Sequence, residues 1–437
     1  MASSRKSKLS LKAIPNSAKR IGLAVSGGLD SVVLLDTVCK AVQVGSSSLT
    51  EVWVFHIHHG LQKPADQWLE FCEKLAKKYR VHFDFRLLHF ADHSLSNVEA
   101  KARAERYDAL TELCIEHGIN DLLLAHHQND QAETVLLQLL RGSGVAGLSG
   151  MPLHRLNSKK DHPIHLWRPL LNQTRVELEA YAKENKLKWV EDPSNQNTRY
   201  RRNAIRKEII PKLEKIQPGA VINLARSAGL LAQSQALLDR LAKQDGKGIL
   251  QGRNLKLATL LTLAKADKSA ASNLMRYWLK ANCLAMPSQE RLESWWRDLM
   301  AVKADSSLEW QHDEASIYLW RGILQVASCT SGAWVFKNVS PRSGLLGLPA
   351  PWVNAAQEEG LIEERLRQGA EKIQIKPNAP RKSLKNLFQE SDTPPWGRQA
   401  PLLFIRGRLI AVAGVGVSYP DLVTTGKRVL PVWLEKL

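Results

Sequence analysis

Paired cysteines are missing from this chain. Its 437 residues include five cysteines, which are scattered along the sequence without a Cys-x-x-Cys pair: Cys39, Cys72, Cys114, Cys283 and Cys329. Zinc ribbons and iron–sulfur clusters need closely spaced thiolates, and a disulfide framework is typical of small secreted proteins. The spacing argues against all three, so we expect free, buried thiols.

Long apolar runs are missing as well. No stretch is long and apolar enough to span a bilayer, and no amphipathic basic anchor stands out. Residues 1–12 are basic and contain serine, but they lack the apolar core of a signal peptide. We therefore expect a soluble, cytoplasmic protein without a membrane partner.

Acidic residues are few relative to basic ones. The sequence has 43 Asp and Glu residues against 61 Lys and Arg residues, which gives a net charge of +18 at pH 7. A chain this basic favours a polyanionic partner, and nucleic acid is the leading candidate. The length exceeds that at which one hydrophobic core usually keeps growing, so we expect two or three domains.

The first half of the chain alternates short β-rich runs with amphipathic helical patterns. This alternation predicts an α/β domain with a doubly wound parallel sheet over residues 1–215. The strands are expected at Ile21–Val25, Val52–His56, Val81–Leu88 and Asp121–Ala125. Ligands of such sheets bind beyond the carboxyl ends of the strands, where the polar motifs of this sequence converge.

The second half of the chain has other patterns. Leucine and alanine at helical spacing predict a mainly helical domain over residues 216–330, with long helices at 221–241 and 255–280. Glycine, proline, serine and asparagine over 331–357 predict a linker. Residues 358–437 predict a small α+β domain, with a helix over 382–389 and a β-hairpin formed by 402–405 and 409–417.

A glycine loop, Ser26-Gly27-Gly28-Leu29-Asp30-Ser31, separates the first strand pattern from a helical pattern. Adjacent glycines let several backbone N–H groups converge on one anion at the start of a helix, so we expect this loop to bind phosphate. The spacing fits neither the Walker motif nor the dinucleotide fingerprint, and Asp30 stands where a Walker loop carries lysine. The alternative is an ordinary glycine turn before a core helix.

Two carboxylates lie at the start of a later predicted helix. Asp130 and Glu133 are three residues apart, which places them on one helix face, where they could hold Mg²⁺ or accept a proton. Seen alone, Asp130 is more often a helix cap than a catalyst. Because a phosphate loop is expected nearby, we favour the catalytic interpretation.

Histidines and arginines near the strand ends have two interpretations each. His56 and His58 point to one side of the predicted strand and His59 to the other, so a metal site is disfavoured. These histidines could instead donate hydrogen bonds to phosphate or adenine, and the alternative is an ordinary turn at the end of the strand. Arg103 and Arg106 share a helix face that could contact phosphate, although a solvated face explains the spacing equally well.

Together the motifs resemble the PP-loop, or N-type, ATP pyrophosphatases and, within them, the bacterial tRNA(Ile)-lysidine synthetase family. The resemblance covers nearly the whole chain. It rests on Ser26–Ser31, His58-His-Gly-Leu61, Arg103-x-x-Arg106-Tyr107, Asn129-Asp-Gln-Ala-Glu-Thr134, Arg168-Pro-Leu-Leu171, Glu191-Asp-Pro-Ser-Asn195, Arg202-Asn203-x-x-Arg206, Arg381–Glu390 and Pro394-Pro-Trp-x-Arg398. The family often has a second aspartate where this chain has Asn129, so no role follows for a first carboxylate there.

The resemblance implies a two-step reaction on tRNA(Ile) with a CAU anticodon. ATP adenylates the oxygen on carbon 2 of the wobble cytidine with loss of pyrophosphate, and the ε-amine of free lysine then displaces AMP. Catalytic roles are implied for Asp30, Asp130 and Glu133, with Asp30 and Asp130 as ligands of Mg²⁺. Since the free amine has a pKa of about 10.4, Asp130 or Glu133 is expected to act as its base.

The resemblance also implies binding residues. ATP is expected to contact Ser26, Gly27, Gly28, Leu29, Asp30, Ser31 and His58. The tRNA is expected to contact Arg103, Arg106, Arg141, Arg202, Arg206, Arg381, Lys382 and Lys385, mainly through backbone phosphates. The domains at 216–330 and 358–437 would bind tRNA, and no obligatory protein partner is expected.

Three other functions are compatible with parts of the sequence. A PP-loop tRNA thiolase generally relies on cysteine pairs or a persulfide cysteine, which the scattered cysteines disfavour. A catalytically inactive RNA-binding protein would not need the intact glycine loop and Asp130. A small-molecule synthetase would leave the charge of +18 unexplained.

Overall fold

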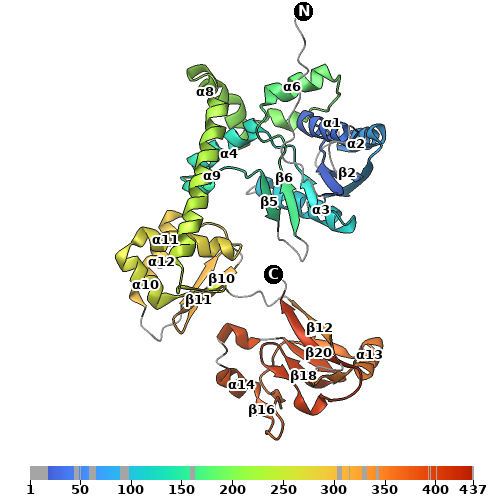
Figure 1. Ribbon diagram of the computed structural model, residues 1–437, viewed down its shortest axis with the longest axis vertical. Helices are drawn as coiled ribbons and strands as arrows, with labels where there is room; N and C mark the ends of the chain where they lie inside the picture. Colours follow the sequence, from blue (N-terminus) through green and yellow to red (C-terminus); the bar gives the residue numbers. More distant parts are fainter. Residues whose placement is uncertain are drawn as a thin grey trace, which may run out of the picture. The chain divides into compact units, whose positions relative to one another are not determined.

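The computed structural model describes residues 18–43, 49, 51–58, 65–88, 98–157, 163–302, 308–313, 315–326, 332–340, 344–391, 393, 395–399 and 401–435. The chain divides into two compact units, Met1–Arg240 and Leu241–Leu437 (Figure 1). Among the helices of these described ranges, none is both long and apolar enough to cross a membrane.

A six-stranded, mostly parallel sheet forms the centre of the first unit. Its strand order is β3-β2-β1-β4-β6-β5, and every neighbouring pair is parallel except β5 with β6. The strands are β1 (Arg20–Ala24), β2 (Glu51–His58), β3 (His82–Leu87), β4 (Asp121–Leu123), β5 (His154–Asn157) and β6 (Ile164–Trp167). The predicted doubly wound α/β fold is confirmed, and all the strands expected for this domain are present.

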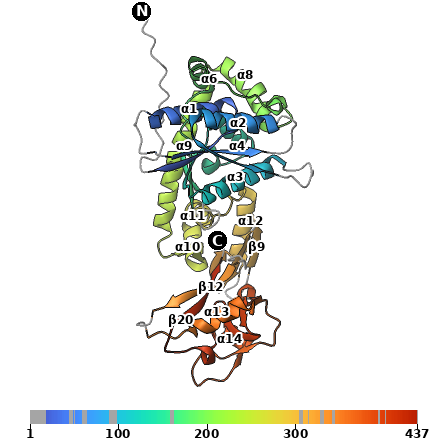
Figure 2. The ribbon, with the colours of Figure 1, turned by 90° about the vertical axis from the view of Figure 1, so that its right-hand side faces the viewer.

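Helices cover both faces of this sheet. They are α1 (Leu29–Gln43), α2 (Ala65–Tyr79), α3 (Val98–Glu116) and α6 (Arg175–Glu184). Figure 2 shows α1 and α2 on one side of the strands and α3 on the other. Strand alternation explains this arrangement, because Val52 and Val54 of β2 pack in the core with α1 and α2, whereas Phe55 and Ile57 pack in the core with α3.

A buried carboxylate joins three of these helices. Asp36 of α1 is 3% exposed and accepts hydrogen bonds of 2.7 Å from the hydroxyls of Tyr79 in α2 and Tyr181 in α6. The ammonium group of Lys40, one turn later in α1, lies 2.8 Å from the same carboxylate. Because a buried charge without partners is costly, this network fixes α1 and α6 to each other.

A second group of helices packs around α4. It comprises α4 (Gln128–Leu140), α5 (Val145–Leu148), the 3₁₀ turn η1 (Pro193–Gln196), α7 (Arg201–Ala204), the π-helix η2 (Ile205–Ile209), α8 (Ile210–Ile216) and α9 (Ala220–Asp245). Ala132, Ile205, Ile210 and Val221 share one small core. The π-helix ends two residues before Pro211, whose missing N–H and bulky ring break regular α-helical bonding.

The second unit starts with a helical region that also contains a sheet. Its helices are α10 (Leu257–Ala266), α11 (Lys268–Ala281) and α12 (Gln289–Ala301), and its strands are β7 (Leu250–Gln251), β8 (Asn254–Lys256), β9 (Leu308–His312), β10 (Ala315–Trp320) and β11 (Ile323–Val326). The sequence does not predict this antiparallel sheet. The helix expected over 255–280 is divided at Asp267, whose carboxylate caps the N–H groups of Ser269 and Ala270.

The rest of the second unit is built from antiparallel strands. Its elements are β12 (Gly332–Val339), β13 (Leu348–Pro349), α13 (Ala350–Glu358), β14 (Ile362–Arg365), β15 (Lys372–Ile373), β16 (Lys382–Ser383), α14 (Leu384–Glu390), η3 (Pro395–Gln399), β17 (Leu402–Ile405), β18 (Arg408–Val412), β19 (Gly416–Val417), η4 (Tyr419–Asp421) and β20 (Arg428–Glu435). The predicted helix and hairpin are present as α14 and the β17–β18 pair.

The segment predicted as a linker, 331–357, has a regular structure over part of its length. It contains β12, which pairs with β20 along all of its residues, and most of α13. Local composition indicates a linker because the partner strand lies at the far end of the chain. Trp334 of β12 meets Trp433 of β20 edge to face at 5.6 Å, and such cross-strand aromatic pairs stabilise a sheet.

Replacing Asp36 tests how strongly its network holds the first unit together. We expect Asp36→Ala to lower the free energy of unfolding by about 2–4 kcal/mol, because it leaves two tyrosine hydroxyls and one ammonium group without their buried acceptor. Calorimetry should show a loss of about 5–15 °C in the unfolding midpoint. The control is Glu70→Ala, which removes a carboxylate of α2 whose side chain is 61% exposed. Equal midpoints for the two variants would contradict this role of Asp36.

Candidate active site

The glycine loop connects β1 to α1 at the carboxyl edge of the sheet. Gly27 has a φ of +85°, and a Cβ atom at this position would lie 2.9 Å from a methyl group of Val190. The N–H of Val190 donates to the carbonyl of Gly27 at 3.0 Å, so a distant segment closes over the loop. Both the conformation and the close approach require glycine.

The two serine hydroxyl groups of the loop lie close to each other. Ser31, in the first turn of α1, donates to the carbonyl of Gly28 at 2.9 Å, and its Oγ lies 3.4 Å from that of Ser26. The first N–H groups of a helix have no partner within the helix, and they carry the positive end of its dipole. Loop and helix start together form a structure suited to bind phosphate.

A histidine lies between the loop and the start of α4. His127 is 1% exposed and caps α4, and its Nδ1 accepts a hydrogen bond from the N–H of Asn129 at 3.2 Å. Its Nε2 lies 3.6 Å from a carboxylate oxygen of Asp30 and 3.5 Å from one of Asp130. Burial opposes the charged form of this imidazole, but the two carboxylates outweigh burial and raise the pKa of His127.

Asp130 stays ionised at this position. The residue is 9% exposed, and its carboxylate accepts a hydrogen bond of 3.0 Å from the backbone N–H of His127. Burial alone would raise the pKa of Asp130, but the neighbouring His127 and Arg202 lower it to about 2. A carboxylate with so low a pKa holds cations well and takes up protons poorly, which weighs against Asp130 as the base expected from the sequence.

Glu133 is buried and bound by two arginines. It is fully shielded from solvent, and its oxygens accept hydrogen bonds from Nε of Arg202 at 2.7 Å and from Nε of Arg206 at 2.5 Å. The same guanidinium groups reach Asp130 at 3.0 and 3.3 Å. Arg202 comes from α7 and Arg206 from the π-helix, so two acids of α4 and two arginines form one ion-pair cluster.

Arg175 connects the start of α1 with the start of α4. Its guanidinium lies 3.4 Å from both carboxylate oxygens of Asp30, and its backbone N–H donates to the side chain of Asn129 at 3.0 Å. Asn129, which stands where the resembled family often has aspartate, thus acts as an acceptor for the start of α6.

Two residues of the site, His127 and Arg175, are not predicted from the sequence. The capping box of Thr174 and Glu177 is visible in the sequence and would have placed Arg175 in a first helical turn.

The histidines of β2 are occupied by local partners. His56 Nδ1 lies 2.9 Å from the carbonyl of Val25, and burial lowers the pKa of this imidazole. His58 Nε2 lies 3.0 Å from the carboxylate of Asp66 in α2. His59 lies outside the described residues. Neither described histidine belongs to a cluster of metal-binding side chains.

The basic residues predicted to bind tRNA occupy different environments. Arg103 and Arg106 are half-buried on α3, Arg202 and Arg206 lie in the ion-pair cluster, and Arg141 is exposed at the end of α4. In the second unit, Lys382 pairs with Glu390 at 2.6 Å, whereas Arg381 and Lys385 are exposed.

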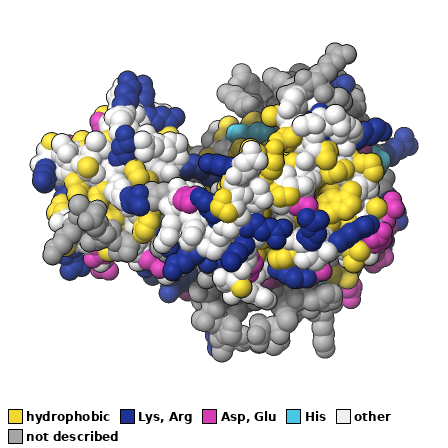
Figure 3. All heavy atoms as spheres, turned by 90° about the horizontal axis from the view of Figure 1, so that it is seen from below, with side chains coloured by type: hydrophobic (Ala, Val, Ile, Leu, Met, Phe, Trp, Pro, Cys, Tyr) yellow, Lys and Arg dark blue, Asp and Glu magenta, His cyan; other side chains and the backbone are white. Residues whose placement is uncertain are grey.

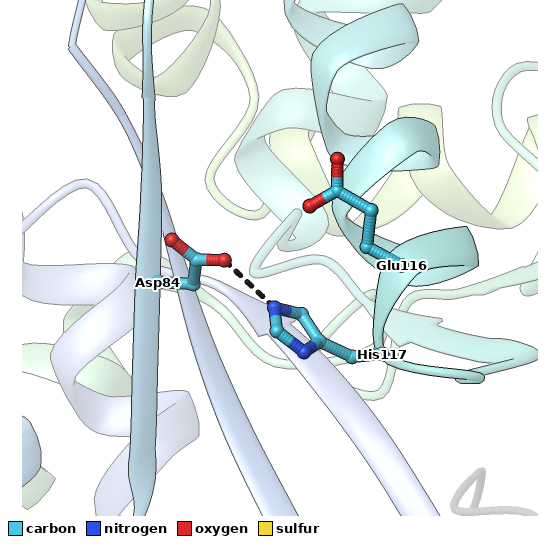
Figure 4. A group of neighbouring side chains, drawn as sticks. All are labelled: Asp84, Glu116 and His117. Carbon is cyan, nitrogen blue, oxygen red and sulfur yellow. Dashed lines mark hydrogen bonds and ion pairs between the residues drawn. The ribbon is translucent and has the colours of Figure 1, made fainter.

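A second cluster of acids has an ordinary structural explanation. Asp84, Glu116 and His117 lie close together at the edge of the sheet (Figure 4), with His117 Nε2 2.7 Å from Asp84. Arg86 forms ion pairs with both carboxylates, and His117 stacks on Trp53 at 3.8 Å. The charges are therefore satisfied within the protein, and the cluster needs no metal ion.

Three family models match the chain in order along its length. A PP-loop domain matches residues 2–213, a TilS substrate binding domain residues 255–325, and a TilS substrate C-terminal domain residues 362–427. The first of these covers the sheet, the glycine loop and the ion-pair cluster described above.

Proteins named tRNA(Ile)-lysidine synthase are similar to almost the whole of this chain. A tRNA(Ile)-lysidine synthase of Burkholderia pseudomallei is 34% identical over 94% of this chain and 91% of its own length. Those of Ralstonia nicotianae and Nitrosomonas europaea are 35% and 33% identical, covering 91% and 97% of this chain and 88% and 93% of their own.

A solved U34-tRNA thiolase of Methanococcus maripaludis is only a distant structural neighbour. Its sequence is 18% identical to this one, and its TM-score is 0.43. The match covers 51% of this chain and 75% of the thiolase chain. The match of all three domain models and the similarity over almost the whole length show that this chain belongs to the tRNA(Ile)-lysidine synthase family.

Proposed function

We propose that this protein is a ligase that joins free lysine to the wobble cytidine of tRNA(Ile) with a CAU anticodon. One observation carries the proposal: the phosphate loop and the acidic start of α4 converge on His127, which lies between the carboxylates of Asp30 and Asp130. The family of the chain supports the choice of tRNA and product. The product lysidine pairs with adenosine, so the codon read changes from AUG to AUA.

The first step adenylates the base. The oxygen on carbon 2 of the cytidine attacks the α-phosphorus of ATP, and pyrophosphate leaves. The N–H groups at the start of α1 and the hydroxyls of Ser26 and Ser31 would bind the phosphates, while Arg175 would add a positive charge beside Asp30. We assign His58 to the same ATP site, because β2 lies next to β1 in the sheet.

The acidic residues fit Mg²⁺. Asp30 and Asp130 both present carboxylate oxygens to the same buried nitrogen of His127, and carboxylate oxygens are the ligands that Mg²⁺ prefers. These two residues would hold the ion, which neutralises negative charge on the phosphates when it is bound. The low pKa of Asp130, about 2, keeps that carboxylate ionised over the whole physiological range.

The second step forms the carbon–nitrogen bond. The ε-amine of lysine, in its unprotonated form, attacks carbon 2 of the cytidine, the bond between carbon 2 and its oxygen breaks, and AMP leaves with this oxygen. The proton that the amine loses passes to water or to the departing phosphate. We assign Asp130 to attract the amine and Glu133 to hold Arg202 and Arg206 in position, because the first is a weak base and the oxygens of the second are occupied.

The tRNA needs a basic surface away from the reacting atoms. Lys and Arg side chains are widespread on the face drawn in Figure 3. Arg141, Arg381 and Lys385 are exposed, and we assign them to backbone phosphates of the tRNA. A cytoplasmic location and the absence of an obligatory protein partner stay predictions.

The thiolase alternative fits the cysteines poorly. Cys39, Cys72 and Cys114 are buried without disulfide partners, and burial raises the pKa of each thiol to about 12. A thiol of this kind supplies almost no thiolate at neutral pH, so it cannot carry sulfur as a persulfide nucleophile. Cys283 is exposed, and Cys329 lies outside the described residues.

The transfer of lysine to tRNA tests the proposal. The purified protein is incubated with ATP, Mg²⁺, radiolabelled lysine and tRNA(Ile) bearing a CAU anticodon. We expect label on the tRNA that depends on ATP, and none on a transcript with guanosine at the wobble position. Asp30→Ala should abolish both the label and the release of pyrophosphate. Release of pyrophosphate by the wild type without transfer of lysine would move the substrate assignment to another PP-loop reaction.

Removing exposed positive charge from the second unit should weaken tRNA binding alone. We expect Arg381→Ala with Lys385→Ala to raise the Kd for tRNA about 10-fold at physiological salt. The slope of log Kd against log salt should fall by about 2, because two phosphate contacts are lost. The matched control is Lys74→Ala with Lys77→Ala, which removes two exposed lysines of α2 that pair with glutamates one turn away. Identical salt slopes in both double variants would refute the assignment.

A further inference from the structure

Strand β3 is an open edge of the six-stranded sheet. In the described part of the chain it pairs only with β2, so one side of its backbone has no strand partner there. Phe85 and Leu87 of this strand are 36% and 49% exposed. An open, apolar sheet edge can pair with a strand of another chain, and natural proteins usually protect such edges. The side chains next to Phe85 show how this edge is protected.

The backbone of Phe85 faces the open side of β3. The N–H of Leu88, just after the strand, donates to the carbonyl of His58 at 2.8 Å, so the backbone groups of Leu88 point toward β2. Because these groups point alternately to the two sides of a strand, those of Phe85, three residues earlier, point away from β2. The N–H and C=O of Phe85 are therefore groups that a further strand would pair with.

Two side chains of β3 occupy these backbone groups. The carboxylate of Asp84 accepts a hydrogen bond from the N–H of Phe85 at 2.7 Å, and Nη1 of Arg86 donates to the carbonyl of Phe85 at 2.9 Å. The same Nη1 lies 3.6 Å from the Asp84 carboxylate. We call Asp84 and Arg86 the edge caps, because they use the hydrogen-bonding groups that another strand would need.

The end of α3 holds the edge caps in place. His117 Nε2 lies 2.7 Å from the other carboxylate oxygen of Asp84 (Figure 4), and Glu116 forms an ion pair with Arg86. His117 in turn stacks on Trp53 of β2 at 3.8 Å. The cluster of Asp84, Glu116 and His117 therefore supports two side chains that cover the backbone of an edge strand.

The sequence of β3 is complementary to a second copy of itself. An antiparallel pair of β3 strands centred on Phe85 sets Asp84 opposite Arg86 of the second copy. It also sets Phe83 opposite Leu87 on the other face of the sheet, because side chains alternate between the faces along each strand. Opposite charges and apolar side chains directly across two strands both stabilise the pairing. A two-fold axis through Phe85 limits such an assembly to two copies.

We propose that β3 is a self-pairing surface and that the edge caps keep it closed to a second copy of this chain. The caps bind the two backbone groups of Phe85 on which the symmetric pair is centred, so they must leave before two strands can pair. They compete well because an intramolecular contact avoids the loss of translational and rotational freedom that association costs. The inference is independent of the proposed function.

Removing the edge caps tests the proposal. Asp84→Ala with Arg86→Ala frees the N–H and C=O of Phe85 and leaves the net charge of the chain unchanged. The molar mass of the full chain is measured by light scattering over a series of protein concentrations. We expect the mass of this double variant to rise with concentration toward twice that of the wild type, while the wild type keeps its mass.

Two further variants accompany the double variant. Glu70→Ala with Lys74→Ala is the matched control, because it removes one acid and one base from an exposed ion pair of α2, and it should keep the wild-type mass. Glu116→Ala releases Arg86 but removes neither edge cap, and its association should need a higher protein concentration. Because Glu116 is 54% exposed at its side chain, this milder variant also serves if the double variant does not fold.

A third substitution identifies the surface. Phe85→Lys, added to the double variant, places two like charges opposite each other at the centre of the strand pair, so it should restore the wild-type mass. An unchanged mass in both the folded double variant and Glu116→Ala would overturn the proposal. Association that Phe85→Lys does not reverse, or that the α2 control also shows, would overturn it as well.

Discussion

The buried ion-pair cluster of α4 is the interaction on which the site depends. Asp130 and Glu133 lie at the start of this helix, Arg202 reaches them from α7, and Arg206 reaches them from the π-helix. Removing one member would leave a charge in a desolvated place, which is far more costly than losing a surface pair. The cluster therefore determines where α4 begins and which way its acids point.

Other contacts connect the start of α4 to the phosphate loop. His127 caps α4 and faces Asp30 of α1, while Arg175 contacts Asp30 and donates its backbone N–H to Asn129. Deeper in the unit, Asp36 holds α1 to α6. The loop, the acids and the arginines thus come from separate segments, and polar contacts between their side chains hold them together. This is the preorganisation that adenylation and amine attack both need.

The sequence predicts what is local and misses what is distant. The glycine loop, the parallel strands and the spacing of Asp130 and Glu133 all follow from short patterns, and the structure has them. The five-stranded sheet of the second unit and the pairing of β12 with β20 join segments that no local pattern connects. The same reason hides the ion pairs of Arg202 and Arg206, since their acidic partners lie about 70 positions earlier in the chain. The expectation that these two arginines contact tRNA stays a prediction.

The measurement that tests the central claim is a double-mutant cycle on the ion-pair cluster. The free energy of unfolding of the first unit is measured for Glu133→Ala, Arg206→Ala and the double variant, since these side chains meet at 2.5 Å. If the cluster acts as a unit, the double variant should lose less stability than the sum of the single losses, by at least about 1 kcal/mol. Losses that simply add would contradict the claim that this buried pair organises the site.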